Sequence, residues 1–152
     1  MPDNKIYLPV FLDITNKSIL IIGGGKIAEQ KLFSISAFTD KITILSKEIN
    51  DNIKKTNFKK INKEYNTVDL YGFYIVYACT NNKEINAQIK SDAAKLNILV
   101  NVVDDPSLCD FISPAIYKEE NITVAVSSSG TNVKKAIEWR NRIKKMFEKE
   151  EI

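Results

Sequence analysis

The first pattern in the chain that could do chemistry is a glycine-rich turn, Gly23-Gly24-Gly25-Lys26-Ile27-Ala28, which fits the spacing Gly-x-Gly-x-x-Gly/Ala. At these positions Gly23 permits a tight turn after a strand, Gly25 leaves room for a pyrophosphate, and Ala28 lets a helix pack closely on the sheet. The start of that helix offers free N–H groups and a partial positive charge. The pattern predicts a dinucleotide site; its alternative is a tight turn that binds nothing.

The cofactor preference would be set where the second strand ends. A typical NAD site places an acid there, to hold the ribose hydroxyls. Here Leu45 is followed by Ser46, Lys47 and Glu48. Glu48 could serve if the turn carries it back to the ribose, whereas Lys47 could accommodate a 2′-phosphate. A solvated charged turn is the third interpretation, so this site leaves NAD and NADP both open.

Asp104 is the candidate for proton transfer. The chain contains no histidine, which excludes a histidine general base, a Ser-His-Asp triad and the common zinc motifs, and we expect no metal site. Asp104 should follow a strand at the same edge as the glycine turn, where a carboxylate is a natural proton acceptor. The local sequence alone favours another interpretation, in which Asp104 and Asp105 cap a turn before Pro106.

A serine turn, Ser127-Ser128-Ser129-Gly130, is the third candidate segment. Its hydroxyls and free N–H groups could bind a substrate carboxylate. They could equally provide the N-cap of the last helix. Both interpretations are carried forward.

The elements that would position these residues alternate along the chain. β-branched apolar runs predict strands at 17–22, 41–45, 73–79 and 98–103, with a short edge strand at 58–61. Helical spacing predicts a helix from Ile27 whose buried face ends at Phe38, a short helix at 49–55, and one capped by Asn81 or Asn82. This alternation predicts an α/β fold, a Rossmann-type doubly wound parallel sheet. Thr80 and Asn101 would lie near the carboxyl ends of the fourth and fifth strands, where such sheets bind their ligands, so both are candidates for the cofactor site.

After Pro106 the alternation stops. Residues 111–117 and 122–126 predict two strands of a β-hairpin with a turn at 118–121. A C-terminal helix should follow Ser129-Gly130-Thr131. One stripe of this helix would hold Val133, Ala136, Ile137, Arg140 and Phe147. We therefore expect an NAD-binding domain at 1–110 and a hairpin-and-helix segment at 111–152.

Composition narrows the class of protein. The 152 residues include 22 basic and 19 acidic side chains, and this net charge of +3 is too small a bias to indicate nucleic acid binding. No run approaches the roughly 20 apolar residues that span a bilayer, and the polar start lacks a signal-peptide core. Cys79 and Cys109 have neither metal nor redox spacing. We expect a cytoplasmic protein without a membrane partner.

The ordered motifs of the chain resemble a known family. Six segments carry the resemblance: Leu8-Pro9-Val10-Phe11-Leu12-Asp13; the glycine turn with Glu29-x-Lys31; Ala78-Cys79-Thr80-Asn81-Asn82; Asn101-Val102-Val103-Asp104-Asp105-Pro106; Cys109-Asp110-Phe111-Ile112-x-Pro114-Ala115; and Val124-Ala125-Val126-Ser127-Ser128. Together they look like precorrin-2 dehydrogenase, the NAD-dependent module of siroheme synthases. The resemblance runs from about Leu8 to Arg142.

The resemblance implies that precorrin-2, a tetrapyrrole with many carboxylates, is oxidised to sirohydrochlorin with hydride passing to NAD⁺. Asp104 matches the catalytic candidate of the family, and Ser128 matches a serine at the tetrapyrrole site. The family's cofactor contacts match Lys26, Ile27, Ser46, Lys47 and Thr80. The resemblance also implies a homodimer formed through the hairpin and last helix.

Departures from the family pattern keep other functions open. The chain ends at Ile152, whereas many relatives carry a further helical domain, so metal chelation is the less expected activity. Asn132-Val133 stands where Ser-Pro would be expected, which affects the start of the last helix. The alternatives are an NAD(H)-sensing regulatory Rossmann domain and a sirohydrochlorin chelatase or tetrapyrrole carrier.

Overall fold

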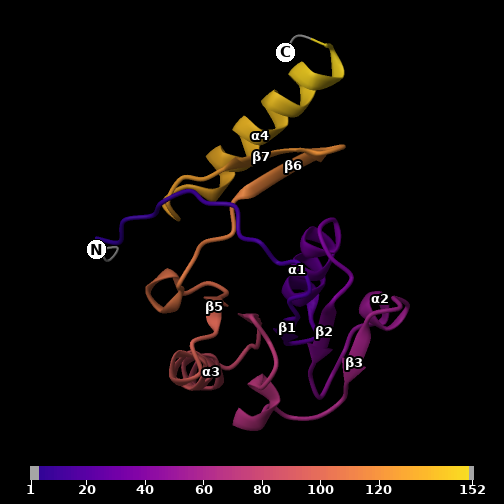
Figure 1. Ribbon diagram of the computed structural model, residues 1–152, viewed down its shortest axis with the longest axis vertical. Helices are drawn as coiled ribbons and strands as arrows, with labels where there is room; N and C mark the ends of the chain where they lie inside the picture. Colours follow the sequence, from indigo (N-terminus) through magenta and orange to yellow (C-terminus); the bar gives the residue numbers. More distant parts are fainter. Residues whose placement is uncertain (1–3, 151–152) are drawn as a thin grey trace. The chain divides into compact units, whose positions relative to one another are not determined.

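A computed structural model gives the structure of the protein and describes residues 4–150 (Figure 1). The chain divides into two compact units. The first is Pro9–Phe111, and the second contains residues 112–150 together with Asn4–Leu8. No helix among the described residues is both long enough and apolar enough to cross a membrane.

The first unit is built on a five-stranded sheet in the order β3-β2-β1-β4-β5. All neighbouring strands in it are parallel. The strands are β1 (Ile19–Ile22), β2 (Ile42–Leu45), β3 (Lys59–Ile61), β4 (Ile75–Ala78) and β5 (Leu99–Val102). Every residue of β1, β2 and β4 is buried, as expected for strands covered on both faces. The predicted parallel sheet is confirmed.

Strand register brings the carboxyl ends of four strands to one edge. Ile22 at the end of β1 lies opposite Leu45 of β2 and Ala78 of β4. Ala78 in turn lies opposite Val102 at the end of β5. The strand order reverses between β1 and β4, where open α/β sheets bind their ligands.

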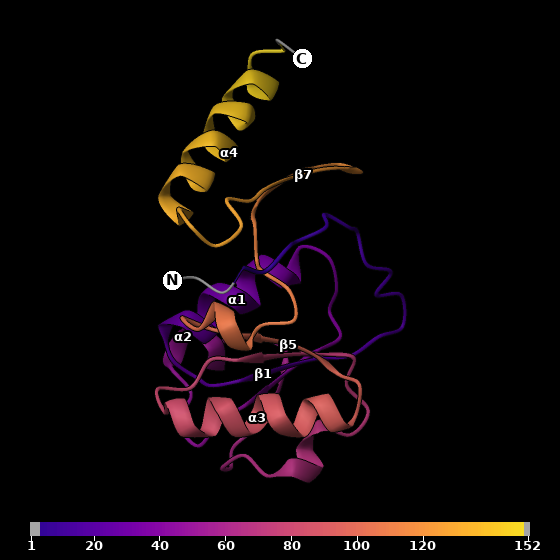
Figure 2. The ribbon, with the colours of Figure 1, turned by 90° about the vertical axis from the view of Figure 1, so that its left-hand side faces the viewer.

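Helices cover both faces of this sheet. One face packs against α1 (Lys26–Ser36) and α2 (Asp51–Lys54), while the other packs against α3 (Lys83–Lys95) and the 3₁₀ turn η1 (Thr67–Leu70). Figure 2 shows α1 and α3 on opposite sides of the strands. A second 3₁₀ turn, η2 (Pro106–Leu108), follows β5. The first unit is therefore a three-layer, doubly wound domain.

The structure corrects one detail of the predicted helices and decides another. Phe38 is not on the buried face of α1, because the helix ends before it and the side chain is 40% exposed. Of the two asparagines expected to cap α3, Asn82 does so: its side-chain oxygen accepts hydrogen bonds from Glu84 N and Ile85 N. Leu32 and Ala28 do form the buried stripe of α1.

The second unit contains an antiparallel hairpin and a long helix. β6 (Ala115–Glu119) pairs with β7 (Ile122–Val126), and α4 (Val133–Glu148) packs against both strands. The Arg140 guanidinium donates to the Ile116 carbonyl oxygen at 3.1 Å, which ties the helix to β6. The hairpin and helix confirm the predicted element order.

Here too the boundaries shift. β6 begins at Ala115 instead of residue 111, and the connecting turn is Glu120-Asn121, with Glu120 in the left-handed region at φ 50°. The predicted stripe of α4 was wrong at two positions, because Val133 is 65% exposed and Ile137 is 39% exposed, whereas Ala136 is buried.

Candidate functional site: a glycine turn and a carboxylate at the switch point

Two glycines of the turn after β1 are needed for packing. Gly23 has φ 133°, and a Cβ there would lie 2.4 Å from the Cys79 carbonyl oxygen. A Cβ at Gly24 would lie 2.0 Å from the Glu48 carbonyl oxygen. The turn packs closely against the backbone that follows β4 and β2, so neither Gly23 nor Gly24 tolerates a side chain.

Gly25 is glycine for a different reason. A Cβ there would meet no atom within 4 Å, and the residue caps α1 without a side-chain hydrogen bond. The first N–H groups of a helix have no partner inside it, and those of Lys26, Ile27 and Ala28 begin α1. This combination of open space, free N–H groups and helix dipole fits the pyrophosphate of a dinucleotide.

The segment after β2 carries the cofactor-preference candidates. Ser46 N donates to the Ile61 carbonyl oxygen at 3.1 Å, which fixes the start of the segment beside β3. The Lys47 ammonium lies 3.4 Å from a Glu64 carboxylate oxygen, in an exposed ion pair. Glu48 places its backbone carbonyl beneath Gly24. Lys47 and Glu48 thus both have partners or packing roles of their own.

A clamp between α1 and the start of α2 was missed by sequence reasoning. The two Glu29 carboxylate oxygens accept hydrogen bonds from the Asn50 amide at 2.7 Å and the Asn52 amide at 2.9 Å. Asn50 also donates its backbone N–H to the Gly24 carbonyl at 2.8 Å and caps α2 through Ile53 N. Asn50 therefore joins the glycine turn, α1 and α2. The only sequence signal was Glu29-x-Lys31, to which no role was assigned.

The end of β4 contributes Cys79 and Thr80. Burial raises the pKa of the Cys79 thiol to about 12, so the thiol is neutral near pH 7. The Thr80 hydroxyl lies 2.5 Å from the Asn86 side-chain oxygen and also accepts from Asn82 N at 3.2 Å. The Asn86 amide returns a bond to the Thr80 carbonyl at 3.1 Å. Thr80 thus fixes the start of α3 to the end of β4.

Asn101 lies within β5 and is also committed to a structural bond. It is 6% exposed, and its amide donates to the Phe111 carbonyl oxygen at 3.0 Å. Its side chain therefore holds the segment after η2 against the sheet.

The two aspartates after β5 have different environments. Asp105 starts η2, and its carboxylate accepts a hydrogen bond from the Ser107 hydroxyl. Asp104 is exposed, adopts the left-handed region at φ 63°, and its carboxylate makes no hydrogen bond or ion pair to any residue in the range 4–150. Asp104 is therefore not a turn cap, contrary to the interpretation that local sequence favoured. Asp104 follows Val102 at the end of β5, and the glycine turn follows Ile22 at the end of β1, so both leave the sheet at its carboxyl edge.

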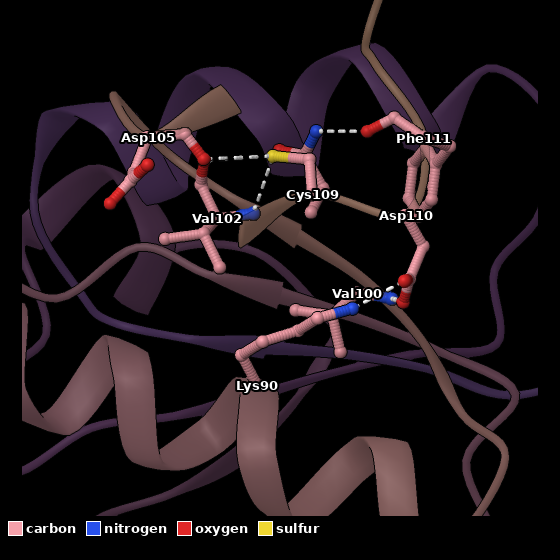
Figure 3. A network of polar contacts seen from close by, with 8 residues as sticks. Lys90, Val100, Val102, Asp105, Cys109, Asp110 and Phe111 are labelled. Atoms are coloured by element: carbon pink, nitrogen blue, oxygen red, sulfur yellow. Dashed lines mark hydrogen bonds and ion pairs between the residues drawn. The ribbon is translucent and has the colours of Figure 1, made fainter. Parts of the chain in front are cut away.

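A polar network along the free edge of β5 holds the loop that carries Asp104 (Figure 3). The Cys109 sulfur accepts from Val102 N at 3.1 Å and donates its S–H toward the Val102 and Asp105 carbonyl oxygens at 3.2 and 3.4 Å. Asp110 accepts from Val100 N at 3.0 Å and pairs with Lys90 of α3. These contacts give partners to backbone N–H and C=O groups on the outer edge of β5, which no further strand covers. They also hold the segment from Asp105 to Asp110 against β5.

The serine turn lies in the second unit, and its proposed capping role was wrong. Asn132 is the N-cap of α4, since its side-chain oxygen accepts from Lys135 N at 3.0 Å. The Ser128 hydroxyl oxygen accepts from Asn132 N at 2.9 Å, and the Ser127 hydroxyl oxygen accepts from Ser129 N at 3.0 Å. The serines build the loop before the cap, with Ser129 at φ 55°.

Residues 4–150 contain no cluster of three or more Cys, Asp or Glu side chains able to hold a metal ion. The chemistry that the described residues can support is therefore that of backbone N–H groups, carboxylates, hydroxyls and lysines around the carboxyl edge of the sheet.

Comparison with known proteins agrees with this geometry. A family described as "Putative NAD(P)-binding" matches residues 10–115. The siroheme synthase of Vesicomyosocius okutanii subsp. Calyptogena okutanii is 37% identical over 128 residues, which are 82% of this chain and 28% of that protein. The siroheme synthase of Psychrobacter sp. (strain PRwf-1) is 40% identical over 126 residues, 80% of this chain and 26% of that one. These relatives confirm the resemblance seen in the sequence.

A solved structure named "SirC, precorrin-2 dehydrogenase" has the same fold, with a TM-score of 0.77 at 23% identity, covering 93% of this chain and 69% of that one. The chain spans only about a quarter of the length of the siroheme synthases it matches. The family match covers the whole sheet and the glycine turn. The chain belongs to the NAD(P)-binding family that this match defines.

Proposed function

We propose that the protein is an NAD-dependent precorrin-2 dehydrogenase, which oxidises precorrin-2 to sirohydrochlorin in siroheme biosynthesis. The observation that carries this proposal is the Asp104 carboxylate, which is exposed, without a hydrogen-bond partner among residues 4–150, and at the same carboxyl edge of the sheet as the glycine turn. The names of the similar siroheme synthases and of the similar SirC structure support the choice of substrate.

The cofactor would be held mainly by backbone. In our proposal Gly25 and the N–H groups of Lys26 and Ile27 bind the pyrophosphate, and Ser46 and Lys47 meet the adenosine ribose. Thr80 and Asn101 would act indirectly, because their side chains already hold α3 and residue 111. We assign NAD, as the resemblance implies, within the broader NAD(P) class.

The reaction removes two hydrogens from the substrate, one as a hydride and one as a proton. When bound, NAD⁺ supplies the hydride acceptor. Asp104 accepts the proton, so that the substrate gains a double bond and no other redox partner is needed. The bonds around Cys109 hold the loop and thereby keep the Asp104 carboxylate at the carboxyl edge of the sheet.

The serine turn would bind a carboxylate of the tetrapyrrole. Ser127 and Ser128 each use the hydroxyl oxygen as an acceptor, which leaves the O–H free to donate. Ser129 would contribute to the same site as part of the loop backbone. A loop of donors suits a polycarboxylate substrate.

We further propose a homodimer formed through the second unit. Val133, Ile137 and Trp139 of α4 and Ile122 of β7 are 39–65% exposed, which is unusual for large apolar side chains on one small unit. A second copy of the chain would cover them. Light scattering that gives the mass of one chain at micromolar concentration would contradict this part of the proposal. The cytoplasmic location stays a prediction.

The deciding experiment mixes enzymatically made precorrin-2 with NAD⁺ and follows NADH absorbance together with the sirohydrochlorin spectrum. Asp104→Asn should lower turnover about 10²–10⁴-fold while the NAD⁺ dissociation constant is kept. Asp105→Asn is the matched control and should leave turnover within a few-fold. Unchanged turnover in Asp104→Asn would remove its role. Nucleotide binding without any turnover would favour a sensing domain, and metal insertion without NAD⁺ a chelatase.

A further inference from the structure

Lys31 differs from the other lysines in its environment. Three lysines of the described chain are half-buried: Lys31, Lys60 and Lys90. The Lys60 ammonium donates to the Phe58 carbonyl oxygen at 2.8 Å, and Lys90 pairs with Asp110. Lys31 has no hydrogen bond or ion pair to any residue between 4 and 150. A half-buried ammonium without an acceptor is costly unless something else completes its coordination.

The position of Lys31 is fixed by aromatic packing. Its ammonium nitrogen lies 5.8 Å from the centroid of the Tyr77 ring on β4. Tyr77 is 9% exposed and meets Phe111 edge to face, with ring centroids 5.6 Å apart. The cation–π contact offsets part of the lost hydration but offers no hydrogen-bond acceptor. Lys31 is therefore held at a defined place, and no residue between 4 and 150 accepts a hydrogen bond from it.

The surroundings of Lys31 are those of the candidate site. Burial lowers the pKa of the ammonium, and Cys79, Cys109 and Asp104 oppose that shift. Asp104 is the only carboxylate among these three groups, and the Cys79 thiol is neutral near pH 7. Lys31 contacts Tyr77, the last residue but one of β4, and Asp104 follows the end of β5. Both groups therefore lie toward the carboxyl edge of the sheet, and no ion pair joins them.

We propose that the Lys31 ammonium is an anion subsite that binds one carboxylate of the tetrapyrrole and so sets the substrate beside Asp104. This inference rests on the proposed function, because it takes its ligand from that substrate class. A half-buried ammonium has already lost part of its hydration. It should bind a carboxylate more strongly than a neutral acceptor, because hydrogen bonds between charged groups are stronger than neutral ones. Lys31 is a substrate-binding residue in this view and takes no part in proton transfer.

The test compares Lys31→Met, which keeps the stem and removes the charge, with Lys31→Arg, which keeps the charge. Lys95→Met, at the exposed last turn of α3, is the control for loss of one positive charge. Two binding constants are measured on the full chain without turnover: NAD⁺ by calorimetry, and sirohydrochlorin by an absorbance titration. The KM and kcat for precorrin-2 are measured in addition.

Lys31→Met should raise the sirohydrochlorin dissociation constant and the KM by about 10-fold or more, with NAD⁺ affinity and the pH profile of kcat kept. Lys31→Arg should restore most of the affinity, and Lys95→Met should match the original chain. Unchanged sirohydrochlorin affinity in Lys31→Met overturns the inference, as does an equal loss of NAD⁺ affinity or a shifted pH profile of kcat. If the original chain binds sirohydrochlorin but does not oxidise precorrin-2, the proposed function fails while the binding titration still decides the role of Lys31.

Discussion

The Glu29 carboxylate accepts a 2.7 Å hydrogen bond from the Asn50 amide, and this contact links the first turn of α1 to the segment that follows β2. Because Asn50 also binds the Gly24 carbonyl, the same contact steadies the glycine turn. The residues proposed to meet the adenosine ribose lie between Leu45 and Asn50. Glu29 should therefore matter to cofactor binding without touching the cofactor.

Glu29→Ala is expected to lower the free energy of unfolding by about 1.5–3 kcal/mol, the usual worth of hydrogen bonds to a charged group. It should also raise the NAD⁺ dissociation constant several-fold. Urea unfolding and calorimetry measure the two effects. Glu84→Ala is the control, since Glu84 is likewise an acid in a first helical turn but is exposed. Equal stability losses in the two variants would show that the clamp contributes nothing.

The adjacent glycines Gly24 and Gly25 should respond to alanine in opposite ways. Gly24→Ala forces a Cβ to within 2.0 Å of the Glu48 carbonyl oxygen and should cost at least about 2 kcal/mol of stability. Gly25→Ala meets open space and should leave stability within about 1 kcal/mol. Its Cβ would instead stand where the pyrophosphate approaches, so NAD⁺ affinity should fall about 10-fold. Thermal unfolding and calorimetry separate the two cases. Tight NAD⁺ binding by Gly25→Ala would place the pyrophosphate elsewhere.

The Ser128 hydroxyl can be separated from the loop that it helps to build. Ser128→Ala removes both the acceptor for Asn132 N and the proposed donor to the substrate. Thr131→Ala removes another bond of the same loop, a 2.7 Å contact from its hydroxyl to the Ser128 carbonyl. Each change should cost about 0.5–1.5 kcal/mol of stability, but only Ser128→Ala should raise the KM for precorrin-2. Steady-state kinetics beside NAD⁺ calorimetry give the answer, and equal kinetic losses would reduce Ser128 to a loop residue.

Most strands of the sheet could be predicted because the signal for each strand lies within a few consecutive residues. β1, β2 and β4 are short apolar runs, and the glycine turn marks the end of β1. The side-chain partners were not predictable, because they join residues far apart in the chain. Glu29 meets Asn50, and Cys109 completes the edge of β5, through contacts that no spacing rule anticipates.

The candidate site divides in the same way. Asp104 could be predicted from its place after a strand. That it does not cap the turn is visible only in the structure, where the Asp105 carboxylate accepts the hydrogen bond from Ser107. The serines were one candidate for the N-cap of α4, since serine is a common cap, but Asn132 occupies that position. Lys31 entered the sequence analysis only as part of the Glu29-x-Lys31 pattern, without a role. Its lack of an acceptor is a property of the folded chain alone.

Alkaline pH should destabilise the protein through Cys79. Burial raises the pKa of this thiol to about 12, from an ordinary value of 9.0. Between these values the unfolded chain binds fewer protons than the folded one, so the free energy of unfolding falls as pH rises. The contribution is fully present below about pH 9 and is lost toward about pH 12, at up to about 1.4 kcal/mol per pH unit.

Urea unfolding of the original chain and of Cys79→Ala at a series of pH values from neutral upward measures this contribution. Cys79→Ala should lose less stability than the original chain above the ordinary thiol pKa. Tyr65→Phe is a second arm, because burial and the hydrogen bond to Asp92 also raise the pKa of Tyr65. The Tyr65 phenol should act at higher pH, since its ordinary value is 10.0. Parallel pH curves for Cys79→Ala and the original chain would mean that the thiol is less buried, and the end of β4 less tightly closed on Gly23, than the structure shows.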